Sequence, residues 1–355
     1  MPALPELLPT LADRLPRVAM GAWPTPLEPA SASGRPVWIK REDLSAPHYG
    51  GNKIRPLELV FGAALAAGKR RIWATGAFGS NHALATLVHA PRRGLEAAAI
   101  LWPQGPSATA AANLEAMLSS GAELRLLHSI AAFPAAAALQ ALVSRHDWVM
   151  PPGAATPLGA LGHAGAAVEL AAQLAAHGEA APRTIVLASG STCTTVGMLV
   201  GTALAAALGL APAAPLPSVH AVRVTPWPVT SAARIVRLAE RTVALLAELG
   251  GPRLDLERAA FRARLVVVGG YLGAGYGRVT ARGLDALTTF APRGLHLDTT
   301  YTAKAAAYLL DRAHQLTAPI VFWASKSSLP LPPRAPDALA AAPKHVRDWL
   351  ASSAC

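Results

Sequence analysis

The feature that most constrains the fold is the alternation of short apolar, β-rich runs with longer alanine-rich stretches of helical periodicity. Seven runs predict strands, at 37–41, 71–75, 97–101, 123–127, 184–189, 220–224 and 319–324. Between them, stretches such as 158–176 and 231–249 repeat apolar residues at helical spacing. Such alternation is typical of βαβ units. We therefore predict an α/β fold with mostly parallel, twisted sheets that are flanked by helices.

Two sheets in two domains are expected within the 355 residues. The segment 150–159, MPPGAATPLG, interrupts both periodicities with prolines and glycines and therefore predicts the crossing point. We expect a small α/β domain of residues 56–159 and a large domain of residues 1–55 and 160–355. The proline-rich segment 327–343 is expected to wrap the surface.

Composition excludes several classes of protein. Hydrophobic residues make up 52% of the chain, yet no run approaches 18 uninterrupted apolar residues, so we expect no membrane span. The amino terminus lacks the basic opening and apolar core of a signal peptide. Cys193 and Cys355 are too few for a disulfide framework or a cysteine-based zinc site, so we expect no metal and a reducing cytoplasm.

The formal net charge of +11 comes mainly from arginines that are scattered along the chain. The densest basic stretches, 69–71 and 91–94, have the pattern of helix ends, where a cation is favourable. Aromatic residues do not alternate with basic ones, as a nucleic-acid groove requires. We therefore expect no nucleic-acid partner and only a mild attraction for anionic ligands.

Lys53 is the first candidate functional residue. It is one of six lysines, and it follows Gly50 and Gly51 at the start of a helical pattern, in PHYGGNKIRPLELV. A surface lysine has no need of a glycine pair, whereas a lysine that reaches a buried small molecule needs a thin, permissive backbone beside it. The sequence therefore predicts a site around Lys53.

Polar residues follow two of the predicted strands, where ligands bind in open α/β sheets. Ser80, Asn81 and His82 open the helix after the strand at 71–75. A helix N-cap explains one of them; three in a row also suit a small pocket in which helix amides bind a carboxylate. The residues leave both interpretations open.

The second junction, SGSTCTTVGMLVG at 189–201, is rich in small hydroxyl residues and leads into an apolar helix. Amides and hydroxyls in such a turn bind a phosphate. The segment has no Walker lysine, no GxGxxG motif and no acidic residue placed for a ribose, so the phosphate is not expected to be that of NAD. A hydroxyl-rich capped turn without a ligand is the alternative.

Together, these features are a reactive lysine, a phosphate cradle and a set of small hydrogen-bonding groups. Weaker signals are the glycine–tyrosine loop at 269–280, the YTAK segment at 301–304 and Ser325 after a buried strand. The combination suits pyridoxal 5′-phosphate, whose aldehyde forms a Schiff base with lysine and whose ring stores negative charge.

Several motifs carry a family resemblance. KREDLSAPHYGGNKIRPLEL, GSNH, the hydroxyl-rich loop, GYG and YTAKA occur in this order. They resemble the fold-type II pyridoxal-phosphate enzymes related to the tryptophan synthase β-subunit, and among them the 1-aminocyclopropane-1-carboxylate deaminase and D-cysteine desulfhydrase family. The resemblance covers about residues 27–330. It implies a two-domain enzyme that binds pyridoxal 5′-phosphate and a small amino-acid substrate, and we expect a homodimer.

The resemblance also implies residue roles. Lys53 is the expected Schiff-base lysine and proton carrier, and Lys53, Ser80 and Tyr301 are the expected catalytic residues. Asn81 would bind the cofactor's phenolic oxygen, and a neutral hydroxyl near the pyridine nitrogen would favour elimination over transamination. The other assignments are Gly190, Ser191, Thr192, Cys193 and Thr194 at the phosphate, Ser325 near the ring nitrogen, and Ser80, Asn81, His82, Tyr276 and Tyr301 at the substrate.

Departures from the family pattern shape the functional expectation. Thr302 stands where the cyclopropane deaminases carry a glutamate, so we expect α,β-elimination of the D-cysteine desulfhydrase kind. The alternatives are ring opening of the cyclopropane amino acid to 2-oxobutanoate and ammonia, or a cofactor-binding homologue with little turnover. The last alternative rests on Gly79, in place of a glutamine, and on SKSS at 325–328, in place of a glycine pair. Lys53 argues against a nucleotide-binding protein without the cofactor.

Overall fold

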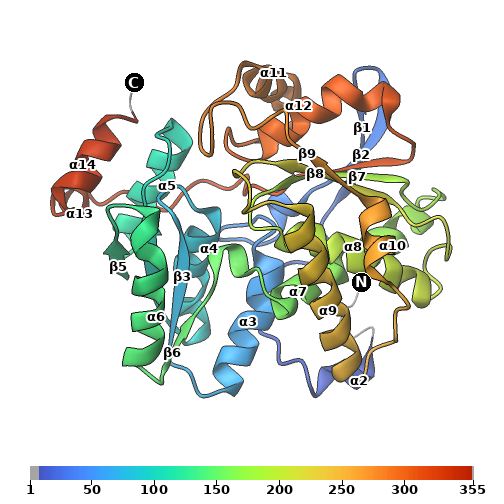
Figure 1. Cartoon of the computed structure of the whole chain (residues 1–355). Helices are drawn as coiled ribbons and strands as arrows, with labels where there is room; N and C mark the ends of the chain where they lie inside the picture. Colours follow the sequence, from blue (N-terminus) through green and yellow to red (C-terminus); the bar gives the residue numbers. More distant parts are fainter. Residues whose placement is uncertain (1–7, 354–355) are drawn as a thin grey trace.

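Two helix-flanked β-sheets organise the chain in a computed structural model that describes residues 8–353 (Figure 1). The six-stranded sheet has the order β1-β2-β10-β7-β8-β9, and the four-stranded sheet has the order β5-β4-β3-β6. Neighbouring strands are parallel except for the antiparallel pair β1 and β2. The α/β class predicted from the sequence is confirmed.

The strands of the larger sheet are β1 (Leu27–Ala32), β2 (Arg35–Lys40), β7 (Thr184–Ser189), β8 (Ser218–Arg223), β9 (Leu265–Val268) and β10 (Ile320–Trp323). Those of the smaller sheet are β3 (Arg71–Ala77), β4 (Glu96–Trp102), β5 (Glu123–Leu126) and β6 (Asp147–Val149). All seven predicted strands are present. The sequence did not predict β1, β6 and β9: β1 contains Pro29, which an edge strand tolerates, and the other two have only three and four residues.

Helices cover both faces of the larger sheet, because its strands bury successive side chains on opposite sides. Val321 packs in a core with α7 (Pro157–Ala176), α8 (Cys193–Ala207), α9 (Ala232–Glu248) and α10 (Arg258–Arg264). The next residue, Phe322, packs on the other face with α11 (Ala281–Phe290) and α12 (Thr302–Arg312). Long apolar runs in the central strands follow from this double coverage.

The smaller sheet is also covered on both faces. Its main core contains side chains from α3 (Ile54–Ala66), α4 (Asn81–His89) and α5 (Ala108–Leu118). A small cluster around Trp73 faces α6 (Phe133–Val143). The remaining helices are α2 (Pro9–Ala12), α13 (Pro336–Ala340) and α14 (Lys344–Ala351). Within residues 8–353, no helix is both long and apolar enough to span a lipid bilayer.

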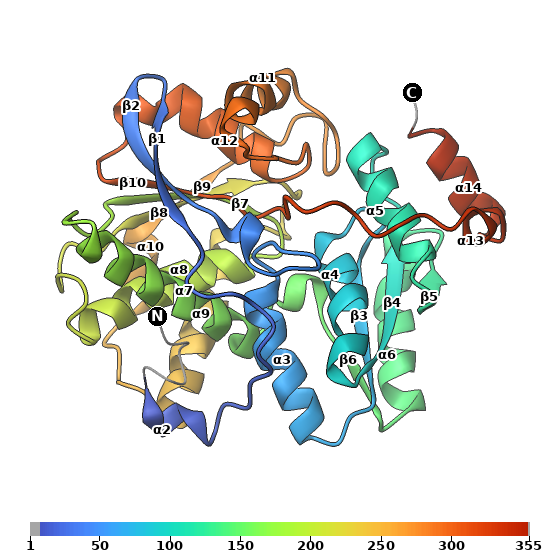
Figure 2. The ribbon, with the colours of Figure 1, turned by 180° about the vertical axis from the view of Figure 1, so that it is seen from behind.

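The C-terminal segment returns from the larger sheet to the smaller one (Figure 2). After β10 the chain runs across the molecule to α13 and α14, and Val346 of α14 is buried in the main core of the smaller sheet. The indole Nε1 of Trp349 donates a hydrogen bond to the Gln104 carbonyl at 2.7 Å. The segment 327–343, which we expected only to wrap the surface, therefore connects the two sheets.

The two-domain division stays a prediction. All strands of the smaller sheet lie between residues 71 and 149, and the segment 150–159 leads from β6 into α7, as expected for the crossing point. Helix α14 belongs to the residues that we assigned to the large domain, yet it packs in the core of the smaller sheet.

Candidate active site

A cavity of about 470 Å³ lies where the carboxyl ends of strands from both sheets meet. Segments that follow β3, β7 and β10 contribute to its wall, as expected for a ligand site in parallel sheets. Eleven of the twelve predicted site residues line it: Lys53, Ser80, Asn81, His82, Gly190, Ser191, Thr192, Thr194, Tyr276, Tyr301 and Ser325. Their individual roles stay predictions, but the fold brings them together.

Cys193 is the exception, because its side chain does not line the cavity. Its buried Sγ donates to the Ala154 carbonyl at 3.3 Å. Burial raises the pKa of this thiol to about 11, so it stays protonated. As the first residue of α8, Cys193 can make its predicted phosphate contact only through its backbone N–H.

Lys53 differs from the other five lysines in lining the cavity. Its Nζ makes no hydrogen bond or ion pair within residues 8–353. Burial lowers the pKa of Lys53 below its ordinary 10.5, which enriches the nucleophilic neutral amine. By contrast, the Nζ of Lys40 binds Glu169, and that of Lys304 donates to the Leu272 carbonyl at 2.8 Å. Geometry therefore singles out Lys53 as the candidate Schiff-base residue.

The glycine pair before Lys53 is needed for close backbone packing. Gly51 has a φ of +97°, and a Cβ there would lie 2.9 Å from the Ser325 carbonyl oxygen. The next amide, of Asn52, donates to that carbonyl at 3.0 Å. Ser327 Oγ accepts from the Gly50 N–H at 3.0 Å. The unusual SKSS segment thus supports the backbone that leads to Lys53.

Asn81 is oriented by two residues that the sequence analysis did not single out. Its Oδ1 accepts hydrogen bonds from the Tyr49 hydroxyl at 3.1 Å and from Asn113 Nδ2 at 2.8 Å. The amide NH₂ of Asn81 is therefore left to donate toward the cavity. A donor in this position suits the predicted contact with the cofactor's phenolic oxygen.

The sequence left open whether these polar residues cap the helix or line a pocket, and Ser80 does both. Ser80 is the N-cap of α4, since its Oγ accepts from the Ala83 N–H at 3.1 Å, and it also lines the cavity. Both ring nitrogens of His82 are buried without a hydrogen-bond partner within the described residues. Burial, helped by the charge of Lys53, lowers the pKa of His82 to about 3. A neutral imidazole thus offers one donor and one acceptor to a ligand.

The loop before α8 has the features of a phosphate cradle. Thr192 adopts a positive φ of 77°, and its buried Oγ1 has no hydrogen-bond partner within the described residues. A Cβ on Gly153 would lie 2.2 Å from Ser191 Oγ, so only glycine fits beside this loop. The N-terminus of α8 follows directly. These unpaired groups, together with the free amine of Lys53, fit pyridoxal 5′-phosphate.

Tyr301 and Tyr276 form a hydrogen-bonded pair of phenols, with ring centroids 6.0 Å apart. Burial raises the pKa of Tyr276 to about 12 and that of Tyr301 well above 10, so both are neutral. Asp298 holds Tyr301 in place, because its Oδ2 accepts the Tyr301 N–H at 3.1 Å. Thr302 Oγ1 donates to Asp298 Oδ1 at 2.7 Å, and Thr302 does not line the cavity.

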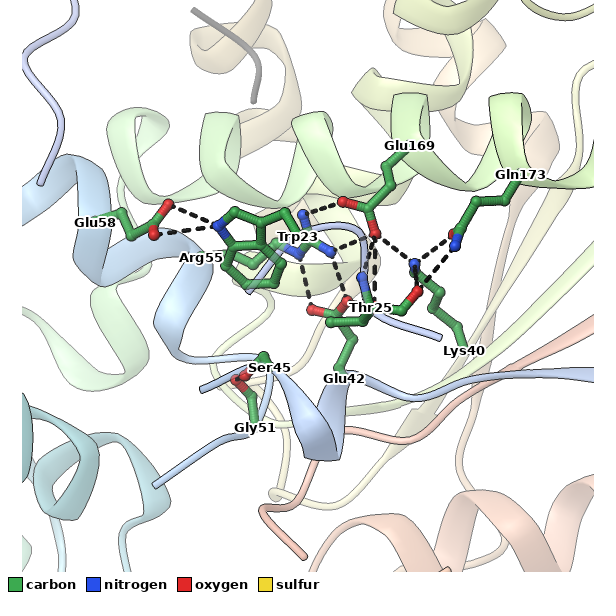
Figure 3. A network of polar contacts seen from close by, with 10 residues as sticks. All are labelled: Trp23, Thr25, Lys40, Glu42, Ser45, Gly51, Arg55, Glu58, Glu169 and Gln173. Atoms are coloured by element: carbon green, nitrogen blue, oxygen red, sulfur yellow. Dashed lines mark hydrogen bonds and ion pairs between the residues drawn. The ribbon is translucent and has the colours of Figure 1, made fainter. Parts of the chain in front are cut away.

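A buried ionic network anchors the helix that begins after Lys53 (Figure 3). The guanidinium of Arg55 lies 3.8 Å from the centre of the Trp23 ring. It donates to Glu42 at 2.7 and 2.9 Å and to Glu169 of α7 at 2.8 and 3.0 Å. The network therefore ties the start of α3 to α7. Sequence reasoning missed it, since hydrogen-bonded members of the network lie up to 148 residues apart and share no local pattern.

Thr194→Val is expected to weaken cofactor retention by about 1–3 kcal/mol, the usual cost of losing a hydrogen bond to a charged group. Thr194 lines the cavity, and its Oγ1 accepts from Asn52 Nδ2 at 2.8 Å, which fixes the hydroxyl in place. Equilibrium dialysis against the free cofactor measures the effect. Thr202→Val, two turns further along α8 and outside the cavity wall, is the matched control. Equal retention by the two variants would argue against the phosphate role.

Comparisons with known proteins bear on the family of this chain. The family model described as "Pyridoxal-phosphate dependent enzyme" matches residues 18–325. The chain is 35% identical over 326 residues to nocardicin C-9′ epimerase of Nocardia uniformis subsp. tsuyamanensis, covering 88% of this chain and 93% of the relative. It is 32% identical over 316 residues to D-cysteine desulfhydrase of Klebsiella pneumoniae subsp. pneumoniae, covering 84% of this chain and 88% of the relative.

A crystal structure described as an ACC deaminase homologue superposes with a TM-score of 0.72 at 27% identity, covering 91% of this chain and 94% of that one. The two-sheet architecture is therefore that of the fold-type II enzymes. The family match spans most of the chain, and relatives above 30% identity cover most of both sequences. The chain belongs to the family of pyridoxal-phosphate-dependent enzymes.

Proposed function

We propose that this enzyme catalyses α,β-elimination from a D-amino acid, with D-cysteine as the reference substrate and Lys53 as the residue that holds the cofactor. The observation that carries the proposal is the unpaired Nζ of Lys53 in a cavity that Ser80 and Tyr301 also line. The relatives named D-cysteine desulfhydrase support this choice of reaction.

When bound, pyridoxal 5′-phosphate supplies an electron sink for charge that develops at the substrate α-carbon. Lys53 removes the α-proton, because burial lowers the pKa of its amine and so favours the neutral form that accepts a proton. Ser80 and the neutral ring of His82 orient the substrate carboxylate. The Tyr301 hydroxyl, held by Tyr276, delivers a proton to the leaving group.

The position of Thr302 favours elimination over opening of a cyclopropane ring. Its hydroxyl is bound to Asp298 and lies outside the cavity wall, so no carboxylate is placed there to assist attack on an unactivated carbon. β-Elimination needs only α-proton removal and a good leaving group. The geometry therefore agrees with the choice that the sequence favours.

Epimerisation is a second candidate, because the relative with 35% identity is named an epimerase. It begins with the same α-proton removal and then returns a proton to the opposite face of the carbon. Lys53 and Tyr301 both line the cavity and could serve as the two proton carriers. Loss of optical rotation without ammonia release would identify this reaction.

Side-by-side assays test the proposed reaction. We expect faster release of sulfide and pyruvate from D-cysteine than of 2-oxobutanoate from 1-aminocyclopropane-1-carboxylate, because no acidic side chain stands at position 302. The measurement is kcat/KM for each amino acid with the purified, cofactor-loaded enzyme. Faster 2-oxobutanoate release would reverse the assignment, and no product from either would favour the homologue with little turnover.

We also propose a homodimer in a reducing cytoplasm. Leu139, Leu142 and Val143 expose an apolar surface on α6, and the chain has only two cysteines. Sedimentation at several protein concentrations tests the oligomeric state, and fractionation of cells tests the compartment.

A further inference from the structure

The cavity extends beyond the groups that the reaction at Lys53 needs. Its lining includes an apolar wall from the smaller sheet, formed by Trp102 at the end of β4 and by Ile130 and Phe133 near the start of α6. The rings of Trp102 and Phe133 pack with centroids 4.7 Å apart. Ile130 is 58% exposed, so this wall reaches the solvent. The thiol of D-cysteine has too little surface to cover it.

A second part of the cavity lining comes from the segment between β8 and α9. Val229 lines the cavity there, together with Thr225 and Pro226. The wall formed by Trp102, Ile130 and Phe133 leaves nonpolar area in contact with water, and a ligand that covers it gains hydrophobic stabilisation. The two parts of the lining therefore suit a substrate side chain with a flat, apolar group.

Arg234 adds a positive charge to this outer part of the cavity. It is the third residue of α9, lines the cavity and is exposed. Its guanidinium makes no hydrogen bond or ion pair within residues 8–353. By contrast, the guanidinium of the exposed Arg258 forms an ion pair with Glu240 at 2.9 Å. A cation in the first turn of a helix is unfavourable for the helix itself. Helix stability therefore does not explain Arg234, whereas an anionic group on a ligand does.

We propose that Trp102, Ile130, Phe133, Val229 and Arg234 form a side-chain subsite, and that the preferred substrate is a D-amino acid whose long side chain carries an aromatic group ending in a carboxylate. The inference rests on the proposed elimination and names its substrate class. In an S-substituted D-cysteine, the α-proton goes to Lys53 and the Cβ–S bond breaks, with its electron pair and a proton leaving on sulfur as a thiol. Water then converts the remaining three-carbon unit into pyruvate and ammonia.

Three probes test the subsite: D-cysteine, S-(4-carboxybenzyl)-D-cysteine and its neutral 4-carbamoyl analogue of nearly the same shape. Binding is followed by the change in cofactor absorbance as each is added to the holoenzyme, and turnover is followed by pyruvate release. We expect the wild type to bind the carboxylate at least tenfold more tightly than the carbamoyl analogue. Arg234→Gln should reduce this ratio to about one while the cofactor absorbance is retained.

Arg237→Gln is the matched control, because Arg237 is exposed on the same helix but does not line the cavity. It should keep both the tenfold ratio and the D-cysteine turnover of the wild type. Phe133→Ala should weaken binding of both benzyl probes to the same extent. Equal binding of the two benzyl probes by the wild type, or the same loss of ratio in both arginine variants, would overturn the subsite.

Binding, measured by cofactor absorbance, tests the subsite, and turnover, measured by pyruvate release, tests the elimination. A carboxylate preference in binding without pyruvate from any probe would support the subsite and contradict the elimination. Pyruvate from D-cysteine with no carboxylate preference would support the elimination and contradict the subsite. No absorbance change with any of the three amino acids would overturn both.

Discussion

Replacing Lys53 by alanine should abolish the visible absorption of lysine-bound cofactor and lower turnover by at least ~10³-fold, the scale expected when a residue that bonds covalently to the reacting system is removed. The fold should persist. No hydrogen bond or ion pair of the Lys53 Nζ would be lost within residues 8–353, so the free energy of unfolding should change by about 1 kcal/mol or less.

Borohydride reduction followed by peptide mapping provides the direct measurement for this variant. In the wild type, the reduced cofactor should be found on the peptide that contains Lys53, and the variant should carry no label. Lys69→Ala is the control, because Lys69 lies away from the cavity and its Nζ donates to the Arg145 carbonyl. Labelling of Lys304 or Lys40 instead would contradict the assignment.

The second large effect is expected for Glu169→Gln, which removes one charge from the buried network. Glu169 and Glu42 balance Arg55 and Lys40, so the variant would leave an uncompensated buried positive charge. Breaking a buried ion pair by removing one partner typically costs about 3–5 kcal/mol. Denaturant unfolding at pH 7 measures this loss. Glu240→Gln should leave stability nearly unchanged, because the carboxylate of Glu240 is partly exposed and pairs with the exposed Arg258.

The same network makes a pH-dependent contribution to stability. Burial alone would raise the pKa of Glu169, but Arg55 and Lys40 outweigh it and lower the pKa to about 2. The ordinary value is near 4.5, so the unfolded chain binds more protons between these limits. The stabilisation is therefore complete above pH 4.5 and lost as the pH falls toward 2. Glu169→Gln should flatten the dependence of the free energy of unfolding on pH in this window. An unchanged dependence would show that other titrating groups determine it.

Much of this fold is readable from periodicity, because buried strands and amphipathic helices leave regular apolar patterns. The central strands β7 and β10 were predicted nearly to the residue. Three of the four edge strands were missed, β1 with its proline and the short β6 and β9, whereas the edge strand β5 was predicted. Local pattern therefore identified the core of each sheet better than its margins.

Residues of the candidate site could be predicted only where their neighbours in the sequence explain the residue type. Lys53 behind two glycines and Ser80 before a helix are such cases. Tyr49, which orients Asn81, and Asp298, which orients Tyr301, were missed. Each acts through a partner that becomes a neighbour only after folding, so spacing along the chain carries no sign of it. Supporting residues of this kind emerge from geometry alone.

Helix α14 has a consequence for how the protein is made. The last strand of the smaller sheet ends at Val149, yet Val346 completes its core some 200 residues later. At about 5–20 residues per second, a ribosome needs roughly 10–40 s to make the intervening chain. Throughout that time the nascent chain carries a sheet with part of its apolar face uncovered. The smaller sheet can therefore reach its final packing only after synthesis of the chain is almost finished.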